Sequence, residues 1–390
     1  MHKIVSDPLH PPARIGIIGG GQLGKMMAIE AKRMGYYVSI LDPSPSAPGG
    51  QVADHQIIAG FSDASAIREL ITSSDVSTFE FEHIDADTLE SLELEGYAIY
   101  PSGSTLKKIQ DKFVQKKMLK EMGVPVPDFF TVSNYLELLK CAEILGFPFV
   151  VKFRRGGYDG KGNFVVHEAC QLKELEAFAE RELLMAERFI DFERELSVVA
   201  ARSVDGQIKR YPIAENVHDQ SILRITRVPA DIKEKVQQNV VNICNKVLEG
   251  FQDCGVFCIE LFLTSDDRVY VNEIAPRPHN SGHYTIEACV TSQFEQLIRI
   301  ITRLPLGSCK LRSPCVMANI LGNETTVGEY TFDGFEKVLN VEDVHLHIYG
   351  KQKSAYLKKV GHITVLDHNI AAAEQKCLKA LSEIKISSVE

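Results

Sequence analysis

The first hundred residues alternate between apolar runs and stretches in which apolar positions recur at helical spacing. Residues 14–24 open as an apolar run and end in glycines, residues 26–35 show the helical spacing, and residues 36–42 form a second apolar run. This order of strand, helix and strand predicts a βαβ unit and therefore a parallel sheet. The alternation continues through a helix over 64–75, a strand over 76–84 and a helix over 88–96.

The middle of the chain mixes helices with strands that flank polar turns. Residues 147–153 and 164–167 predict two strands around the glycine-rich loop RRGGYDGKGN. Residues 255–264 and 268–276 predict a β pair across the turn TSDD. The other elements expected here are helices over 111–123, 135–146, 231–251 and 291–304, and strands over 183–191, 194–203 and 207–214.

After about residue 308 the pattern changes to short strands over 315–322, 345–351 and 359–367, with one helix from about Ile370. We therefore expect domains at 1–104, 105–308 and 309–390. The pattern predicts an α/β class for the first domain, which is Rossmann-like, and an α+β class for the rest, with a small β-rich domain at the C-terminal end.

Composition narrows the classes of protein that this chain can represent. Its 390 residues are 45% hydrophobic and 24% charged, which suits a globular protein of two to three domains. The net charge of −9 argues against nucleic acid as a partner, since phosphate binding needs a basic surface. No apolar run reaches the roughly 20 residues of a membrane span, and the start lacks the apolar core of a secretory signal. Nine cysteines without a CxxC pair indicate free thiols and a cytoplasmic location.

The first glycine loop admits two interpretations. Gly19, Gly21 and Gly24 match G-x-G-x-x-G between a strand and a helix, and Asp42 ends the next strand. That arrangement is typical of dinucleotide binding, because glycines let the backbone approach phosphate at a helix N-terminus. It would support an NAD(P)-dependent oxidoreductase. The same glycines equally suit any tight turn between a strand and a helix.

The second glycine loop carries more charge and is more specific. Lys152 precedes it and Lys161 lies within it, so ammonium groups and backbone amides could neutralise a polyphosphate. The alternative is a plain β-hairpin. Further along, Glu187 ends a strand in a manner suited to a hinge that binds a flat base, with Glu195 eight residues later. A strand with exposed acids is the alternative there.

Glu260 and Glu273 lie inside two adjacent apolar strands. A buried carboxylate is costly unless it is paired or bound to a metal. Two of them on neighbouring strands predict a Mg²⁺ site, with Mn²⁺ as an alternative ion, because these ions prefer oxygen ligands. A separate salt bridge for each acid is the other possibility. Lysines are absent from both strands, which favours the metal.

Taken in order, these segments resemble the ATP-grasp superfamily and, within it, the N5-carboxyaminoimidazole ribonucleotide synthetases. The similarity runs from about residue 14 to 366. It is carried by GGGQLG, LDPSPSAP, FEFEHI, QDKFVQK, GYDGKGN, FERELSVVAAR, YPIAENVH and NEIAPRPHNSGHYT. The resemblance implies a central two-lobed ATP-grasp domain and an ATP-dependent carboxylation of aminoimidazole ribonucleotide by bicarbonate, through carboxyphosphate, in purine biosynthesis.

The resemblance also implies roles for individual residues. Glu260 and Glu273 would bind the metal. Arg277, His279 and Glu82 would serve the chemistry. The residues implied to hold ATP are Lys112, Lys152, Gly157, Tyr158, Asp159, Gly160, Lys161, Gly162, Asn163, Glu187, Arg188, Phe189, Ile190, Glu195, His218, Asn272 and Glu273. Those implied to hold the ribonucleotide are Gln22, Leu23, Glu82, Asn280, Lys351, Lys358 and Lys359. In NEIAPRPHNSGHYT, either His279 or His283 could contact substrate.

One segment departs from the family. The segment after the YGK lysine usually resembles RPGRKMGH, whereas this chain has AYLKKVGH, Ala355 to His362. Lysine lacks the bidentate fork of arginine, so the 5′-phosphate is expected to be held differently. The family implies a homodimer and a separate mutase as the next enzyme. The alternatives are a formate-dependent glycinamide ribonucleotide transformylase on the same scaffold, the dehydrogenase, and a nucleotide sensor without catalysis.

Overall fold

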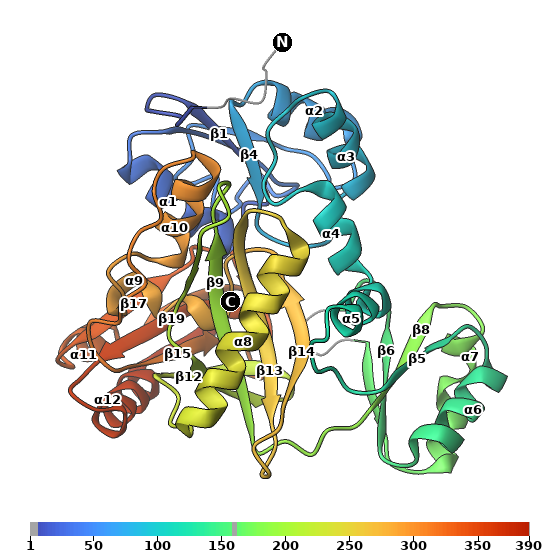
Figure 1. The fold of residues 1–390 in the computed structure, drawn as a ribbon. Coiled ribbons are helices and arrows are strands. Elements are labelled where there is room, and N and C mark those ends of the chain that lie inside the picture. Colours follow the sequence, from blue (N-terminus) through green and yellow to red (C-terminus); the bar gives the residue numbers. More distant parts are fainter. Residues whose placement is uncertain (1–6, 158–161, 390) are drawn as a thin grey trace.

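The computed structural model describes residues 7–157 and 162–389 (Figure 1). The N-terminal sheet is parallel with strand order β3-β2-β1-β4, as the βαβ pattern predicted. Its strands are β1 (Arg14–Ile18), β2 (Tyr37–Leu41), β3 (His55–Ile57) and β4 (Val76–Phe79), and its helices are α1 (Gln22–Arg33), α2 (Ala64–Thr72) and α3 (Ala86–Leu94). Strand β3 was not predicted, because its three residues are partly polar and lie at the sheet edge.

A small lobe projects from the body of the molecule (Figure 1). Its sheet has the order β5-β8-β6-β7 and is antiparallel throughout. The strands are β5 (Phe129–Val132), β6 (Phe149–Phe153), β7 (Asn163–Val166) and β8 (Leu184–Arg188). The helices of this lobe are α6 (Tyr135–Leu145), the 3-10 helix η1 (Ala169–Leu175) and α7 (Glu176–Ala179). Helices α4 (Gly103–Gln110) and α5 (Lys112–Glu121) precede the lobe and pack on the N-terminal domain and the central sheet. The apolar faces of α6 and η1 pack with the sheet into one core.

The main body is built on a nine-stranded sheet with the order β14-β13-β9-β11-β12-β15-β19-β17, and β10 pairs with β9. Its strands are β9 (Arg194–Arg202), β10 (Ile208–Arg210), β11 (Ala214–Asp219), β12 (Ile222–Val228), β13 (Gly255–Leu263), β14 (Val269–Ala275), β15 (Cys315–Leu321), β17 (Val344–Ile348) and β19 (Lys359–Leu366). Because β12 pairs with β15, the C-terminal strands continue the central sheet. The domain limits at residues 104 and 308 stay predictions.

Helices cover both faces of the sheet at β13. Successive side chains of a strand point to opposite faces, so Phe257 and Ile259 pack with α8 (Glu234–Phe251). Val256 and Cys258 lie in a second core with α10 (Gln293–Ile301) and α1. This packing joins the N-terminal domain to the central sheet and explains why β13 reads as a continuous apolar run.

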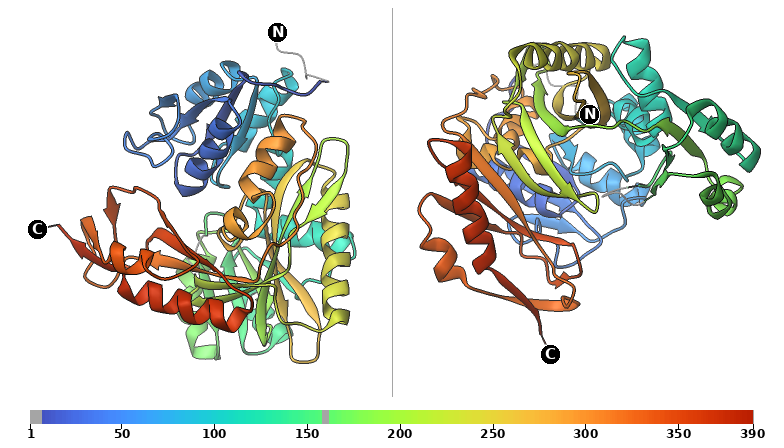
Figure 2. Two further views of the ribbon diagram at one scale, coloured as in Figure 1. Left: turned by 90° about the vertical axis from the view of Figure 1, so that its left-hand side faces the viewer. Right: turned by 90° about the horizontal axis from the view of Figure 1, so that it is seen from below.

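The C-terminal helix α12 (Ile370–Glu383) lies along β15 and β19 (Figures 1 and 2). The remaining elements are the 3-10 helix η2 (Asn280–Gly282), α9 (Thr285–Ala288), α11 (Phe335–Leu339), β16 (Gly328–Asp333), β18 (Lys353–Ser354) and β20 (Lys385–Ser388). Strands β18, β16 and β20 form a small separate sheet. The final strand β20 was not predicted.

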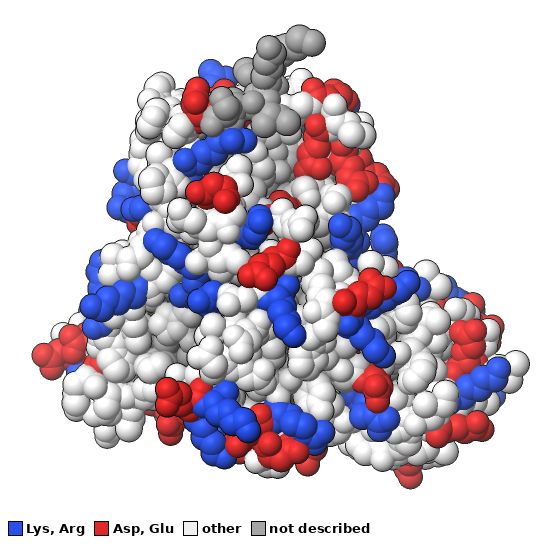
Figure 3. Space-filling model, viewed as in Figure 1, with Lys and Arg blue, Asp and Glu red and all other residues white. Residues whose placement is uncertain are grey.

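Charges on the molecular surface are mixed in sign. Figure 3 shows Lys and Arg interspersed with Asp and Glu over the face seen in Figure 1. Within residues 7–157 and 162–389, the structure has no helix both long and apolar enough to cross a membrane. All nine cysteines are free, and eight of them are buried.

Candidate functional site

Two lysine side chains of helix α5 lie at the boundary between the small lobe and the central sheet. Its N-cap Asp111 accepts hydrogen bonds from two backbone amides of the first turn, which fixes where the helix begins. Lys112 and Lys116 are four residues apart and share one helix face. Lys112 Nζ lies 2.6 Å from Glu273 Oε1, and Lys116 Nζ lies 3.0 Å from Glu187 Oε1.

Lys152 on β6 connects the small lobe to β14. Its Nζ lies 3.2 Å from Glu187 Oε2 and donates to Asn272 Oδ1 at 3.3 Å. Burial lowers the pKa of Lys116 to about 8. Burial opposes ionisation of Glu187 as well, but the Lys116 and Lys152 ammonium groups lower its pKa. These side chains and those of Lys112 and Glu273 line a narrow cavity between the lobes.

Glu260 and Glu273 face each other across the antiparallel pair β13–β14, where they are directly opposed in register. The β pair that the sequence predicted therefore brings both carboxylates to one place. Burial, and then the neighbouring Glu273 carboxylate, raise the pKa of Glu260 to about 7. Although burial also disfavours the ionised form of Glu273, the Lys112 ammonium lowers its pKa.

The donor set at this point suits a hard cation. It offers carboxylate oxygens from Glu260 and Glu273 and the amide oxygen of Asn272, all on adjacent strands. Oxygen ligands of this kind are those that Mg²⁺ prefers. The described residues contain no cluster of three or more His, Cys, Asp or Glu side chains that could hold a metal by themselves. A metal here would therefore need ligands from a bound substrate as well.

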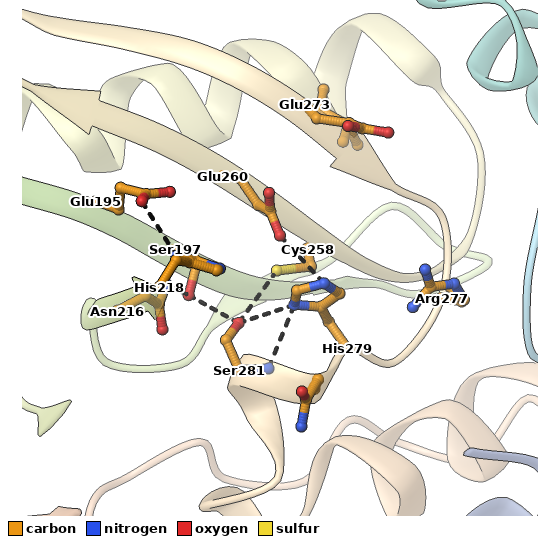
Figure 4. Close-up of polar contacts among 12 residues, drawn as sticks. Glu195, Ser197, Asn216, His218, Cys258, Glu260, Glu273, Arg277, His279 and Ser281 are labelled. Carbon is orange, nitrogen blue, oxygen red and sulfur yellow. Dashed lines mark hydrogen bonds and ion pairs between the residues drawn. The ribbon is translucent and has the colours of Figure 1, made fainter. Parts of the chain in front are cut away.

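Two histidines each contact one acid of the site (Figure 4). His279 Nε2 lies 3.1 Å from Glu260 Oε1, and His218 Nδ1 lies 3.1 Å from Glu195 Oε1. Burial and the nearby Arg277 guanidinium hold the pKa of His279 well below its usual range. For His218, burial opposes the charged ring but the Glu195 carboxylate raises its pKa. The surroundings thus favour the neutral ring of His279 and the charged ring of His218.

Arg277 bridges the central sheet to the N-terminal domain. Its Nε lies 2.8 Å from Glu82 Oε1 and its Nη2 donates to Glu82 Oε2 at 3.1 Å, so the ion pair engages both carboxylate oxygens through one hydrogen bond and one close contact. Burial opposes the charge of Arg277, but the Glu82 carboxylate raises its pKa. Glu82 follows β4, so this pair brings the end of the parallel sheet to the loop after β14.

The first glycine loop is filled by a side chain of the protein itself. The buried Glu80 carboxylate accepts from Gly21 N at 2.5 Å and from Gly24 N at 2.7 Å. Asp42 accepts from Gly20 N at 2.9 Å. A dinucleotide pyrophosphate would need these same amides. The arrangement therefore argues against the dehydrogenase.

Gln22 and Leu23 begin α1 directly after this loop. The Leu23 side chain belongs to the core, so only its backbone could contact a ligand. Gln22 is half-buried.

Asn280 and His283 are both enclosed by the protein. Asn280 Nδ2 donates to Asn319 Oδ1 at 3.0 Å, and Asn319 Nδ2 donates to Asn280 Oδ1 at 2.8 Å. This reciprocal pair leaves Asn280 little capacity for a substrate. His283 is fully buried, with its ring 4.7 Å from that of His362. Of the two histidines left open by the sequence, His279 is the one that faces the carboxylates.

The predicted phosphate lysines lie in the C-terminal part of the chain. Lys351 Nζ donates to the carbonyl of Lys359 at 2.8 Å, which closes the turn between β17 and β19. Lys358 is exposed. Leu357 has φ of +63°, in the left-handed region that favours glycine, at the position where the family pattern has one. Leu357 thus adopts a backbone conformation that glycine favours, although the glycine is absent.

The second glycine loop joins β6 to β7, as predicted. Of its seven predicted nucleotide residues, Gly157, Gly162 and Asn163 are described, and Tyr158, Asp159, Gly160 and Lys161 lie outside the described residues. Arg188 ends β8, and Phe189 and Ile190 begin the link to β9, which is the connection between the two lobes. The Glu187 carboxylate, which was predicted to help bind the base, contacts Lys116 and Lys152.

Sequence reasoning gave no role to Lys116, Glu80 or Asn319. Lys116 could have been found from its spacing of four residues from Lys112 on one helix face. Glu80 could have been found because it lies two residues before Glu82 in the predicted strand over 76–84, near the carboxyl end, where parallel strands place their functional side chains. No local signal marks Asn319, since it pairs with a residue 39 positions away.

Family models match three consecutive parts of the chain. The ribonucleotide synthetase preATP-grasp domain matches residues 13–110, and the ATP-grasp domain matches residues 117–294. The phosphoribosylaminoimidazole carboxylase C-terminal domain matches residues 315–376. The order agrees with the Rossmann-like, ATP-grasp and C-terminal β-rich fold expected from the sequence.

Whole-chain relatives agree with these models. The chain is 44% identical over 359 residues to N5-carboxyaminoimidazole ribonucleotide synthase of Bacillus subtilis, covering 92% of each protein. The crystal structure of the Thermotoga maritima synthetase is 47% identical with a TM-score of 0.88, covering 97% of this chain and all of that one. The Aspergillus clavatus synthase, in complex with ADP and 5-aminoimidazole ribonucleotide, is 32% identical with a TM-score of 0.86, covering 95% of this chain and 98% of that one.

Proposed function

This chain belongs to the N5-carboxyaminoimidazole ribonucleotide synthase family, and from that premise we propose that it carboxylates 5-aminoimidazole ribonucleotide in purine biosynthesis. The reaction consumes ATP and bicarbonate. The observation that carries the proposal is that Lys112 and Lys152 meet Glu273 and its strand partner Glu260 where the small lobe joins the central sheet, while Arg277 links that sheet to Glu82 of the N-terminal domain. Cations and carboxylates of this kind are what two anionic substrates and a metal require.

ATP would lie between the small lobe and the central sheet. Lys112 and Lys152 would contact its phosphates, since both ammonium groups border the cavity between the lobes. The backbone of residues 188–190, at the link between the lobes, would hold adenine, and Glu195 with His218 would hold the ribose. The short loop after β6 would then cover the phosphates and exclude water.

Glu260 and Glu273, with Asn272, would hold Mg²⁺ or Mn²⁺, since they form an all-oxygen donor set on adjacent strands. When bound, the ion would neutralise phosphate charge that builds up during transfer. Lys112 already neutralises Glu273, so the lysine and the ion would divide this charge between the carboxylate and the phosphates.

The chemistry proceeds in two steps. A bicarbonate oxygen attacks the γ-phosphorus of ATP, ADP leaves, and carboxyphosphate forms. The exocyclic amine of the ribonucleotide then attacks the carboxyl carbon, either in carboxyphosphate or in CO₂ released from it, and phosphate and a proton leave. The first step supplies a leaving group that bicarbonate lacks.

Arg277, His279 and Glu82 would handle the reacting groups. Arg277 brings a buried positive charge toward the bicarbonate and carboxyphosphate oxygens. Both carboxylate oxygens of Glu82 contact the Arg277 guanidinium. Each oxygen still has a further lone pair that can accept a hydrogen bond from the substrate amine. This pair would therefore place the nucleophile beside its electrophile.

The ribonucleotide would extend from Glu82 and Gln22 toward Lys351, Lys358 and Lys359, which would hold its 5′-phosphate. Asn280 would support this region through its pair with Asn319. The protein would act as a homodimer. Its carbamate product would pass to a separate mutase.

ADP release by the purified protein tests this function. ADP and phosphate should appear only when both bicarbonate and 5-aminoimidazole ribonucleotide are present. Formate with glycinamide ribonucleotide, in the same assay, tests the transformylase alternative. If neither substrate pair stimulates ATP turnover, both enzyme functions are refuted and a nucleotide sensor is the better description.

A further inference from the structure

A chain of buried polar side chains runs from β12 to His279, and Figure 4 labels its members Asn216, Ser197, Ser281 and His279. Thr226 Oγ1 donates to Asn216 Oδ1 at 2.9 Å, and Asn216 Nδ2 donates to Ser197 Oγ at 2.9 Å. Ser197 Oγ donates to Ser281 Oγ at 2.8 Å, and Ser281 Oγ lies 2.9 Å from His279 Nδ1.

The first four of these side chains are almost wholly enclosed. Ser197 and Ser281 are each 1% exposed, and Thr226 is not exposed at all. Water therefore cannot satisfy them, and each hydroxyl must use its single proton within the chain.

The direction of the chain follows from proton counting. The hydrogens of the Asn216 amide are on Nδ2, so Ser197 Oγ accepts a hydrogen bond from Asn216. The Ser197 hydroxyl then donates its own proton to Ser281 Oγ. The Ser281 hydroxyl proton can then point at His279 Nδ1, 2.9 Å away, or at Cys258 Sγ, 3.7 Å away, and the imidazole nitrogen is the nearer and the stronger acceptor. The backbone N–H of Ser281, which can only donate, also points at this nitrogen, at 3.3 Å. Both donors require Nδ1 to be the unprotonated nitrogen of the ring.

We infer that the chain Thr226–Asn216–Ser197–Ser281 holds His279 in the tautomer with its proton on Nε2. His279 therefore serves the site as a hydrogen-bond donor. Its Nε2 lies 3.1 Å from Glu260 Oε1, on the side where the carboxylates and Arg277 lie. Ser281, Ser197 and Asn216 act through His279 and are positioning residues.

This inference rests on the proposed function for its chemical meaning. A neutral Nε2–H donor can bind the negative oxygens of bicarbonate and carboxyphosphate without taking up a proton. A ring with the opposite tautomer would present a lone pair to those oxygens and repel them.

The tautomer can be measured in the unliganded protein. Histidine labelled with ¹⁵N gives distinct nitrogen shifts for protonated and unprotonated ring atoms, and His279→Gln identifies the resonances of this ring. We expect a protonated Nε2 and an unprotonated Nδ1. A proton on Nδ1 overturns the inference, whatever the enzyme's activity. Absence of carboxylation with Nε2 protonated would instead refute the proposed function and leave the tautomer standing.

Variants then test whether the chain sets the tautomer. Ser281→Ala should add the Nδ1–H form to the spectrum and lower kcat roughly tenfold, with the KM for ATP unchanged, because one hydrogen bond to Nδ1 is lost. Ser281→Thr keeps the hydroxyl and should restore both. Ser197 does not contact the His279 ring, yet Ser197→Ala should also increase the share of the Nδ1–H form.

Cys258→Ala is the matched control. Cys258 Sγ lies 3.7 Å from Ser281 Oγ, a longer and weaker contact than the 2.9 Å between Ser281 Oγ and His279 Nδ1, so its loss chiefly tests packing. This variant should keep the wild-type spectrum and kcat. If Ser281→Ala and Ser197→Ala both behave like Cys258→Ala, the chain does not set the tautomer and the inference fails. If either serine variant does not fold, the wild-type spectrum and the other variant decide.

Discussion

At the scale of single residues, the site is defined by opposite charges that neutralise one another across strands and domains. Glu273 is the central case, because it faces Glu260 and receives Lys112. Glu273→Ala would remove a metal ligand and leave the Lys112 ammonium without its partner. We expect turnover to fall by at least about 100-fold. ADP release measured over a range of Mg²⁺ concentrations checks this.

Glu329→Ala, at an exposed position on β16, is a control for the loss of one surface carboxylate. It should keep full activity. Near-normal turnover in Glu273→Ala would show that the predicted metal site is wrong.

The raised pKa of Glu260 predicts how metal binding depends on pH. Its pKa of about 7 means that the carboxylate is partly protonated near neutral pH, and a cation must displace that proton. Binding of Mg²⁺ with ADP should therefore tighten as pH rises from about 6 to about 8 and should release a proton at the lower pH. Calorimetry in two buffers of different ionisation enthalpy measures this release. Equal affinity and no proton release at both pH values would contradict it.

The raised pKa of Glu260 also affects the folding stability of the metal-free protein. The pKa of Glu260 is raised in the folded state, so the unfolded chain ionises this group first as pH increases. Its contribution to the free energy of unfolding is greatest below about pH 4.5, near the unfolded value, and falls as pH rises to about 7. Glu260→Gln should flatten that part of the stability profile, as followed by urea unfolding.

At the scale of elements, periodicity predicted the strands that carry the site better than it predicted their partners. The apolar runs over β13 and β14 placed Glu260 and Glu273 on neighbouring strands, and the structure has them paired in register. The absence of lysine from those strands suggested no ammonium partner, yet Lys112 arrives from α5, over 150 positions away in the chain. Contacts between distant elements leave no mark on local periodicity.

The start of α5 offers a prediction at this scale. Asp111 caps the helix and also pairs with both guanidinium arms of Arg154, at 3.0 and 2.6 Å. Asp111→Ala should lower the free energy of unfolding by roughly 2–4 kcal/mol, because a cap and a buried ion pair are lost together. It should also raise the KM for ATP, since Lys112 is the first residue of the helix.

Asp111→Asn separates the two effects, because asparagine can still cap the helix but cannot pair with Arg154 as an anion. Its loss of stability in urea unfolding should be smaller. Equal losses in the alanine and asparagine variants would mean that capping contributes nothing measurable.

The turn between β18 and β19 carries the chain's departure from the family pattern. Lys358 stands where that pattern has arginine, and a guanidinium can hold two phosphate oxygens at once. Lys358→Arg should lower the KM for the ribonucleotide several-fold, with kcat unchanged, as measured by initial rates of ADP release. Lys353→Arg, at an exposed lysine of β18, should change neither value. An unchanged KM in Lys358→Arg would remove this lysine from the phosphate site.

At the scale of the whole molecule, the site exists because three parts of the chain meet. Composition and motif order were enough for the fold and the family, since each part has its own periodic pattern. They could not give the pairing of β12 with β15, which merges the C-terminal strands with the central sheet. Nor could they show that Glu80 fills the glycine loop, because a carboxylate and a phosphate satisfy backbone amides in the same way.

The contact between the N-terminal and C-terminal parts predicts that substrate binding can be changed from a distance. Lys25 on α1 donates to the carbonyl of Tyr349 at 2.9 Å, and Gln51 Nε2 donates to that of Gly350 at 2.7 Å. Lys351 follows at once, so these two bonds hold the predicted phosphate lysine against the N-terminal domain. Lys25→Met should raise the KM for the ribonucleotide roughly 3- to 10-fold and leave the KM for ATP unchanged.

Lys32→Met is the matched control for that variant, because Lys32 lies on the same helix but pairs with Asp54 inside the N-terminal domain. It should leave both KM values at their wild-type levels. An equal rise in the two KM values of Lys25→Met would mean that the helix affects the whole site through stability. A selective rise for the ribonucleotide would mean that the N-terminal domain sets the position of Lys351, and hence the distance between phosphate and amine that the substrate must span.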